Sequence, residues 1–189
     1  MLLKLDIQNS KRYDVRRLND LSNLANLEYL YISDMIIRLD AFNGLKKLIK
    51  LSLENCHLDG NTLLSNDSKQ LFSSLTNLKI LEVNNLKFPI NVESLENIKI
   101  LIFQSVEDFD LLENLGNRFI GLSLSLLVFY TSNYRRIVSK NMDSFLKRHN
   151  FDNVTHLRLS QFDKDFNPCW LKSFANLKRL SLSTCALNE

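Results

Sequence analysis

The chain has 189 residues, of which 45% are hydrophobic and 24% are charged, and its formal net charge is +3. This composition is ordinary for a globular protein, and the length is enough for one domain with a sizeable core. The charge is too mild for a nucleic-acid binder, which usually carries a concentrated basic patch. The longest apolar stretch, residues 119–130, is about half the ~20 residues that span a bilayer, so we expect no membrane insertion within this chain.

A short apolar unit recurs eight times in chain order. In each copy a leucine is followed two residues later by a second large apolar residue, and another apolar residue lies three positions before the leucine. Because alternate residues of a strand point to the same side, each pair predicts a short strand with one buried face. The pairs, 20 to 35 residues apart, are Leu5/Ile7, Leu30/Ile32, Leu51/Leu53, Leu81/Val83, Leu101/Phe103, Leu122/Leu124, Leu157/Leu159 and Leu180/Leu182.

The connections between these pairs carry a different pattern. Residues 42–48, 72–78 and 92–98 have apolar residues at every third position, which predicts short helical or 3₁₀ returns. The two longest connections, residues 59–75 and 132–150, are each expected to hold a helix. In the second helix we expect four side chains to face inward: Ile137, Val138, Phe145 and Leu146.

The segments "LIKLSLENCHL" (48–58) and "LKRLSLSTCAL" (177–187) match every position of the pattern L-x-x-L-x-L-x-x-(N/C)-x-L. In this the chain resembles the leucine-rich repeat family. The resemblance implies an α/β solenoid of horseshoe shape, with a concave parallel sheet of about eight short strands and a convex side of mixed helical, 3₁₀ and irregular structure. We expect residues 1–189 to form a single leucine-rich repeat domain. Because matches begin and end close to both termini, we also expect a fragment without its terminal caps.

Cys56 and Cys185 occupy the same position of the repeat, three residues after the second apolar residue of a pair. Other copies place apolar residues there, among them Met35, Leu86, Val106 and Leu127, so we interpret both cysteines as core residues. We expect Cys169 to be a single thiol in a connection. The histidines are scattered and no catalytic or metal-binding motif is present, so we expect no enzyme activity, no metal and no cofactor.

The concave face is the candidate binding surface. Its side chains are predicted by the alternation: those between the paired residues are Asp6, Tyr31, Ser52, Glu82, Ile102, Ser123, Arg158 and Ser181, and those just before each pair are Lys4, Tyr29, Lys50, Ile80, Ile100, Gly121, His156 and Arg179. Exposed aromatic and aliphatic groups clustered on one surface often mark a protein contact. The predicted contact residues are therefore Tyr29, Tyr31, Ile80, Glu82, Ile100, Ile102, His156 and Arg158. The alternative is that β-branched residues simply favour strands.

The predicted function is recognition of a protein ligand by the concave face. Two runs, Phe42-Leu45-Leu48-Leu51 and Phe72-Leu75-Leu78-Leu81, resemble the repeats of Toll-like receptor ectodomains. That resemblance implies an extracellular part of an innate-immune receptor. The alternative is an intracellular adaptor region, of an F-box substrate receptor or of a nucleotide-binding immune receptor. The sequence leaves the compartment and the oligomeric state open.

Overall fold

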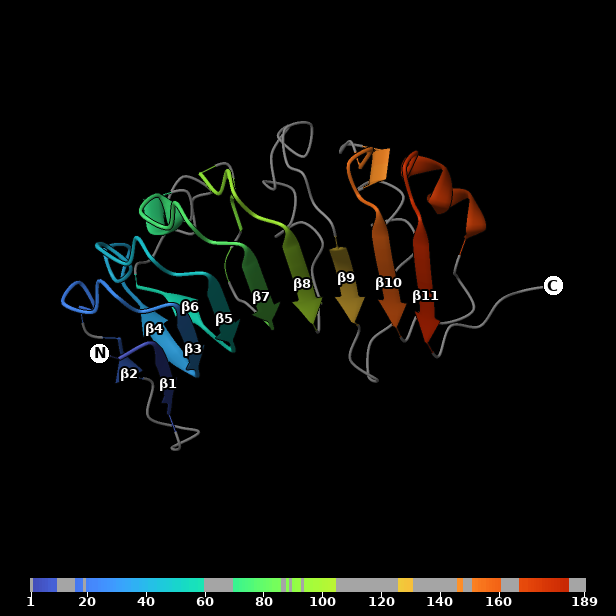
Figure 1. Ribbon diagram of the computed structural model, residues 1–189. Coiled ribbons are helices and arrows are strands. Elements are labelled where there is room, and N and C mark those ends of the chain that lie inside the picture. The colour runs from blue at the N-terminus through green and yellow to red at the C-terminus, as the bar shows by residue number, and fades with distance from the viewer. Residues whose placement is uncertain are drawn as a thin grey trace.

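Eight parallel strands form one long sheet in the computed structural model, and they follow one another in chain order along a shallow arc (Figure 1). The structure describes residues 2–9, 16–18, 20–59, 70–85, 88, 90–92, 94–104, 126–130, 146–147, 151–160 and 167–183. The strands of the long sheet are β1 (Lys4–Gln8), β3 (Tyr29–Ser33), β5 (Lys50–Glu54), β7 (Ile80–Asn84), β8 (Ile100–Gln104), β9 (Leu126–Tyr130), β10 (His156–Ser160) and β11 (Arg179–Ser183). Since each strand pairs in parallel with the next one along this order, the chain completes one coil per strand, and the fold is a solenoid.

The paired apolar residues of the repeat form two columns through the core. The first column is Leu5, Leu30, Leu51, Leu81, Leu101, Leu127, Leu157 and Leu180, and the register places the second column two residues later on every strand. In β3, β5, β7, β8 and β10 both columns are buried. Burial of each such side chain contributes about 1.5–3 kcal/mol. At the ends of the sheet the columns are less covered, and Leu180 is 37% exposed.

The sixth strand lies five residues later than the sequence pattern predicts. Leu127 and Phe129 of β9 align with Leu101 and Phe103 of β8, so the predicted pair Leu122/Leu124 is wrong. The stretch "LSLSLLVFY" satisfies the two-residue alternation in more than one register, and alternation alone cannot choose between them. The register observed uses the segment richest in β-branched and aromatic residues, which favour strands. Leu127 therefore takes the same register position as Leu101 and Leu157, whereas Leu122 and Leu124 lie outside the described residues.

The predicted returns are built of successive turns, each closed by a bond between residues three apart, rather than of continuous helix. In residues 42–48, the amide of Leu45 donates to the carbonyl of Phe42 and the amide of Leu48 to that of Leu45, at 3.1 Å each. The same bonds between residues three apart recur in residues 72–78 and 92–98. A 3₁₀ helix, η3 (Pro168–Ser173), precedes β11 and begins at Asn167, whose side chain accepts a hydrogen bond from the amide of Cys169.

The two expected helices fall mostly outside the described residues. Of the connection 59–75, residues 70–72 are helical. Of the connection 132–150, residues 146 and 147 are helical, and Leu146 is buried as predicted. Ile137, Val138 and Phe145 lie outside the described residues.

A second, three-stranded parallel sheet was not expected from the sequence. Its strands are β2 (Arg16–Arg17), β4 (Met35–Ile37) and β6 (His57–Leu58), in the order β2-β4-β6. The chain enters β4 directly from β3 through Asp34, and it enters β6 from β5 through Asn55 and Cys56. Asp34 and Asn55 have φ of 58° and 51°, and asparagine and aspartate adopt this left-handed conformation more readily than most residues.

Two ladders of asparagine side chains hold successive coils together. Where the chain enters the strands, the side-chain amides of Asn77, Asn97 and Asn176 donate to backbone carbonyls of the preceding coil at 2.7–2.8 Å. Where the strands end, the Asn55 amide donates to the Asp34 carboxylate at 3.2 Å, and the Asn85 amide donates to the Asn55 carbonyl at 2.9 Å. The coils of β5 and β7 are thus fixed to each other at both edges of the sheet, and several other neighbouring coils are fixed at one edge.

Cys56 is a core residue, as predicted. Its side chain is fully buried, and its Sγ lies 3.2 Å from the Glu54 carbonyl and 3.6 Å from that of Ile32. Burial raises the pKa of the Cys56 thiol to about 11, so the thiolate needed for a nucleophile is suppressed. Cys169 is an exposed free thiol, and Cys185 lies outside the described residues.

Candidate functional site

The candidate site is the face of the long sheet that points away from the core, which we call the open face. Residues at alternate strand positions line up across the sheet in three rows. Row one is Lys4, Tyr29, Lys50, Ile80, Ile100, Leu126, His156 and Arg179; row two is Asp6, Tyr31, Ser52, Glu82, Ile102, Val128, Arg158 and Ser181; row three is Gln8, Ser33, Glu54, Asn84, Gln104, Tyr130, Ser160 and Ser183.

The structure places all eight predicted contact residues in rows one and two. Tyr29 is 41% exposed, Arg158 is exposed, and the other six are partly exposed. Ile80 and Ile100 are neighbours in row one, and Ile102 lies beside them in row two. His156 and Arg158 belong to β10 and are separated from this cluster by β9. In place of the predicted Gly121 and Ser123, the rows contain Leu126 and Val128, because β9 lies five residues later.

Two partly exposed carboxylates, those of Glu54 and Glu82, hold neighbouring side chains of the open face by hydrogen bonds and an ion pair. The first of these networks centres on Glu54. The Tyr31 hydroxyl donates to one oxygen of Glu54, and the Asn84 amide donates to the other at 3.0 Å. Burial and the bond to Glu54 raise the pKa of Tyr31 to about 12, so the hydroxyl stays protonated and donating at neutral pH. Both oxygens of Glu54 are therefore satisfied within the sheet.

Glu82 forms a second network on the same face. One oxygen of Glu82 lies 2.9 Å from the Lys50 ammonium, and the other accepts a hydrogen bond of 2.7 Å from the Gln104 amide. Row three supplies Glu54, Asn84 and Gln104 to the two networks, and the sequence reasoning missed this row. The signal was available, since the residue after the second paired residue is polar in every strand.

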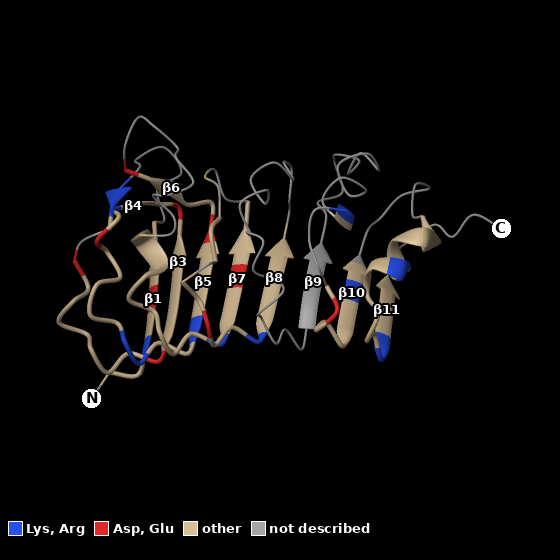
Figure 2. Ribbon diagram, turned by 90° about the horizontal axis from the view of Figure 1, so that it is seen from above, with Lys and Arg blue, Asp and Glu red and all other residues tan. Residues whose placement is uncertain are grey.

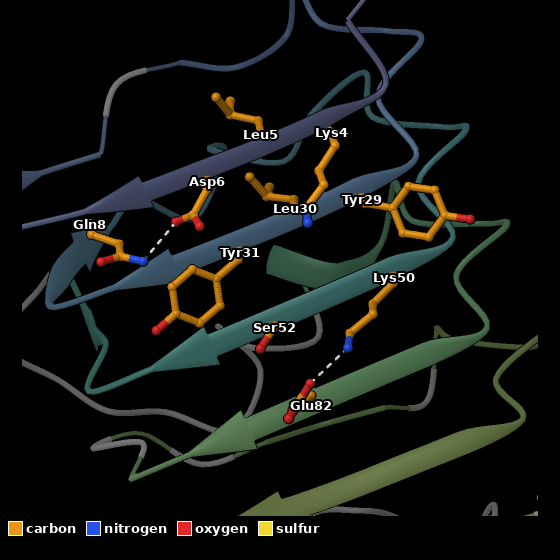
Figure 3. A pocket seen from close by; sticks show the side chains of 10 residues that line it. All are labelled: Lys4, Leu5, Asp6, Gln8, Tyr29, Leu30, Tyr31, Lys50, Ser52 and Glu82. Carbon is orange, nitrogen blue, oxygen red and sulfur yellow. Dashed lines mark hydrogen bonds and ion pairs between the residues drawn. The ribbon is translucent and has the colours of Figure 1, made fainter.

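A hollow of about 620 Å³ lies over β1, β3 and β5 (Figure 3). Ser52 is small and lies between Tyr31 and Glu82 in row two, so the sheet is least filled at this point. The residues that line the hollow are Lys4, Leu5, Asp6, Gln8, Tyr29, Leu30, Tyr31, Lys50, Ser52 and Glu82. Aromatic, cationic and anionic groups thus surround one shallow depression.

Charge differs between the two edges of the long sheet. The first residue of each strand and the residue before it contribute one carboxylate, Glu28, and six cations to the described structure: Lys4, Lys50, Lys79, Lys99, Lys178 and Arg179, which we call the basic edge. The opposite edge, where the strands end, has the carboxylates Asp34 and Glu54 and no cation among its described residues. In Figure 2 blue gathers where several strands begin, and red lies where β3 and β5 end.

The described residues contain no cluster of three or more His, Cys, Asp or Glu side chains arranged to hold a metal ion. None of the described helices is both long and apolar enough to cross a membrane. Comparison with protein-family models and with curated proteins gave no match to this chain. The site is therefore interpreted from its own geometry.

Proposed function

We propose that this chain is a protein-binding module of the leucine-rich repeat type, and that it recognises its partner with the open face of the long sheet. The observation that carries the proposal is the apolar cluster of Ile80, Ile100 and Ile102, partly exposed on adjacent strands. Tyr29 and Tyr31 lie in the same two rows on β3, with β5 between them and this cluster. Exposed apolar and aromatic side chains grouped on a rigid scaffold are typical of contact residues.

The leucine-rich repeat assignment rests on the repeating unit and on the way it coils. In the described coils that end in β3, β5, β7 and β8, successive turns lead into one short strand with two core leucines or equivalents. Strands in a sheet lie about 4.8 Å apart, whereas packed turns and helices need more room. A solenoid with strands on one side and bulkier returns on the other therefore bends towards the strands. The proposed shape is therefore a horseshoe whose concave surface is the open face.

The rigidity of the open face also favours a binding role. Tyr31 is held by Glu54, and Glu82 is held by Lys50 and Gln104, so these side chains lose little further freedom when a partner binds. Ile80 and Ile100 lie in row one next to Lys50, which belongs to one of these networks. At these partly exposed positions, polar side chains would cost less free energy to expose to water. A binding surface accounts for both the fixed polar groups and the exposed isoleucines.

The test is a single charge placed in the isoleucine cluster. Peptides selected from a random 12-residue display library on the purified chain would be measured by fluorescence polarisation against Ile100→Asp and Ile102→Asp. We expect each variant to weaken binding about tenfold or more, since a buried contact is replaced by an unpaired charge. The matched control is Asn43→Asp, which places the same charge on an exposed turn of the return side.

Circular dichroism would show whether each variant keeps its fold, because both isoleucines are only partly buried. Selected peptides that bind the two isoleucine variants as tightly as the unmodified chain would refute the proposed binding face.

A further inference from the structure

We propose that the partner presents an acidic peptide segment, with carboxylates on both sides of an apolar centre, and that this segment lies across the strands along row one. The inference deepens the proposed function and rests on it. It names the chemistry of the partner and the part of the open face that reads it.

Charge is distributed unevenly along row one. Its first and third members are Lys4 and Lys50, its last two are His156 and Arg179, and it contains no carboxylate. Between them lie Ile80 of β7 and Ile100 of β8, which are neighbours in the register. Row one therefore carries Lys4 and Lys50 at one end and Arg179 at the other, with isoleucines between them, which is the complement of an acidic–apolar–acidic segment.

Several cations of row one and of the adjoining basic edge are available to a partner. Lys50 is engaged by Glu82 at 2.9 Å. Within the described part of the structure, by contrast, Lys4, Lys79, Lys178 and Arg179 form no ion pair, and all four side chains are exposed. Cations that have no internal carboxylate can pair with one supplied from outside at little desolvation cost.

Tyr29 adds a hydrogen-bond donor at the same place. It lies in row one between Lys4 and Lys50, and Figure 3 shows it at the rim of the hollow. Its hydroxyl makes no hydrogen bond within the described structure, unlike that of Tyr31. A carboxylate above β1 and β3 could thus meet an ammonium group and a phenol together.

At the opposite edge of the open face, charge repulsion disfavours binding of an acidic segment. Asp34 and Glu54 lie where β3 and β5 end, and the oxygens of Glu54 are already occupied by Tyr31 and Asn84. An acidic segment shifted towards that edge would meet the like charge of Asp34 and Glu54, and the described last residues of the eight strands contribute no lysine or arginine there. Attraction at the basic edge and repulsion at the other confine the segment to row one.

The dimensions fit a short peptide. Row one crosses eight strands, and seven intervals of about 4.8 Å give a length of roughly 34 Å. An extended chain rises about 3.3 Å per residue, so about ten residues cover the row. A library of 12-residue peptides therefore offers segments long enough to reach both cationic ends.

The experiment selects peptides from this random library on the purified chain and reads their sequences. We expect the peptides that lose binding to Ile100→Asp to be enriched in aspartate and glutamate on both sides of apolar residues. Their affinity should fall about tenfold in Lys79→Glu, where attraction becomes repulsion, and should weaken as salt rises from low to high concentration. The matched control, Lys172→Glu, makes the same charge change on η3 and should alter affinity less than about twofold.

Three results separate the inference from the proposed function. Peptides that depend on Ile100, are acidic and respond to Lys79→Glu but not to Lys172→Glu support both. Peptides that depend on Ile100 but are neutral or basic, or that respond equally to the two lysine variants, overturn the acidic partner and leave the binding face standing. Peptides whose affinity is unchanged by Ile100→Asp overturn the proposed function and this inference with it.

Discussion

At the scale of the residue, the coil depends on positions where the backbone adopts a conformation that most residues avoid. Asp34, Asn55 and Asn85 follow directly after β3, β5 and β7, and their φ angles are 58°, 51° and 48°. Their side chains also form the ladder that links neighbouring coils. Asparagine suits these positions for two reasons. Its backbone tolerates the left-handed region, and its side-chain amide can donate a hydrogen bond to one coil and accept one from the next.

Substitution of Asn55 separates these two contributions. Asn55→Gly keeps the left-handed backbone but removes the bonds to Asp34 and Asn85, and we expect it to lower the free energy of unfolding by about 1–2 kcal/mol. Asn55→Ala removes the same bonds and adds the left-handed penalty, so it should cost about 1 kcal/mol more than glycine. Urea denaturation measures both values, with Asn43→Ala as an exposed control. Equal losses for glycine and alanine would show that the backbone conformation is unimportant here.

The reaction rate of the Cys56 thiol tests whether this side chain is buried. Two single-thiol chains are needed: Cys169→Ser with Cys185→Ser leaves Cys56, and Cys56→Ala with Cys185→Ser leaves Cys169. We expect Cys56, which is fully buried, to react with a thiol-specific disulfide reagent at pH 8 at least a hundredfold more slowly than the exposed Cys169. Similar rates in the two folded chains would contradict the core assignment.

The raised pKa of Cys56 also makes the free energy of unfolding depend on pH. The thiol titrates near 9 by its ordinary value and near 11 in the fold. Between these pH values the unfolded chain has lost the proton while the folded chain still holds it. The contribution of Cys56 to stability is therefore fully present below about pH 9, and it declines as pH rises towards 11.

At the scale of the element, the sequence predicts strands well where the leucine pairs are isolated and poorly where apolar residues are continuous. Seven of the eight strands lie at the predicted pairs. A polar residue follows every one of these seven pairs, and in most of them the residue between the two members is polar too, which fixes the side that faces the core. In the stretch 119–130 the alternation has several solutions, and only pairing with β8 and β10 selects Leu127 and Phe129.

The candidate site follows the same rule. Apart from the two β9 positions, rows one and two are predicted by alternation alone, so the eight predicted contact residues fall in these rows without knowledge of the fold. The hydrogen bonds from Tyr31 and Asn84 to Glu54 join residues on three adjacent strands, at separations of 23 to 30 residues along the chain. A linear pattern carries no information about which carboxylate meets which donor. The β4 and β6 strands were missed for a related reason, since two or three residues are too few to show any period.

At the scale of the whole molecule, each coil contacts mainly its two neighbours, so stability should vary along the chain. The inner strands β5, β7 and β8 have both core columns buried, and each pairs with a strand on either side. The end strands have one partner, Leu5 and Ile7 of β1 are only partly buried, and Leu180 of β11 is 37% exposed. Fewer buried contacts mean a smaller free energy for local opening.

Native-state hydrogen exchange would measure this gradient. We expect the backbone amides of β5, β7 and β8 to exchange most slowly, and those of β1 and β11 to exchange faster by at least about tenfold, equivalent to about 1.4 kcal/mol of opening free energy. Leu81→Ala should then lower protection most in β5, β7 and β8, because Leu81 packs within that part of the column. Uniform protection in all eight strands, with a uniform response to Leu81→Ala, would mean that the solenoid opens only as one cooperative unit.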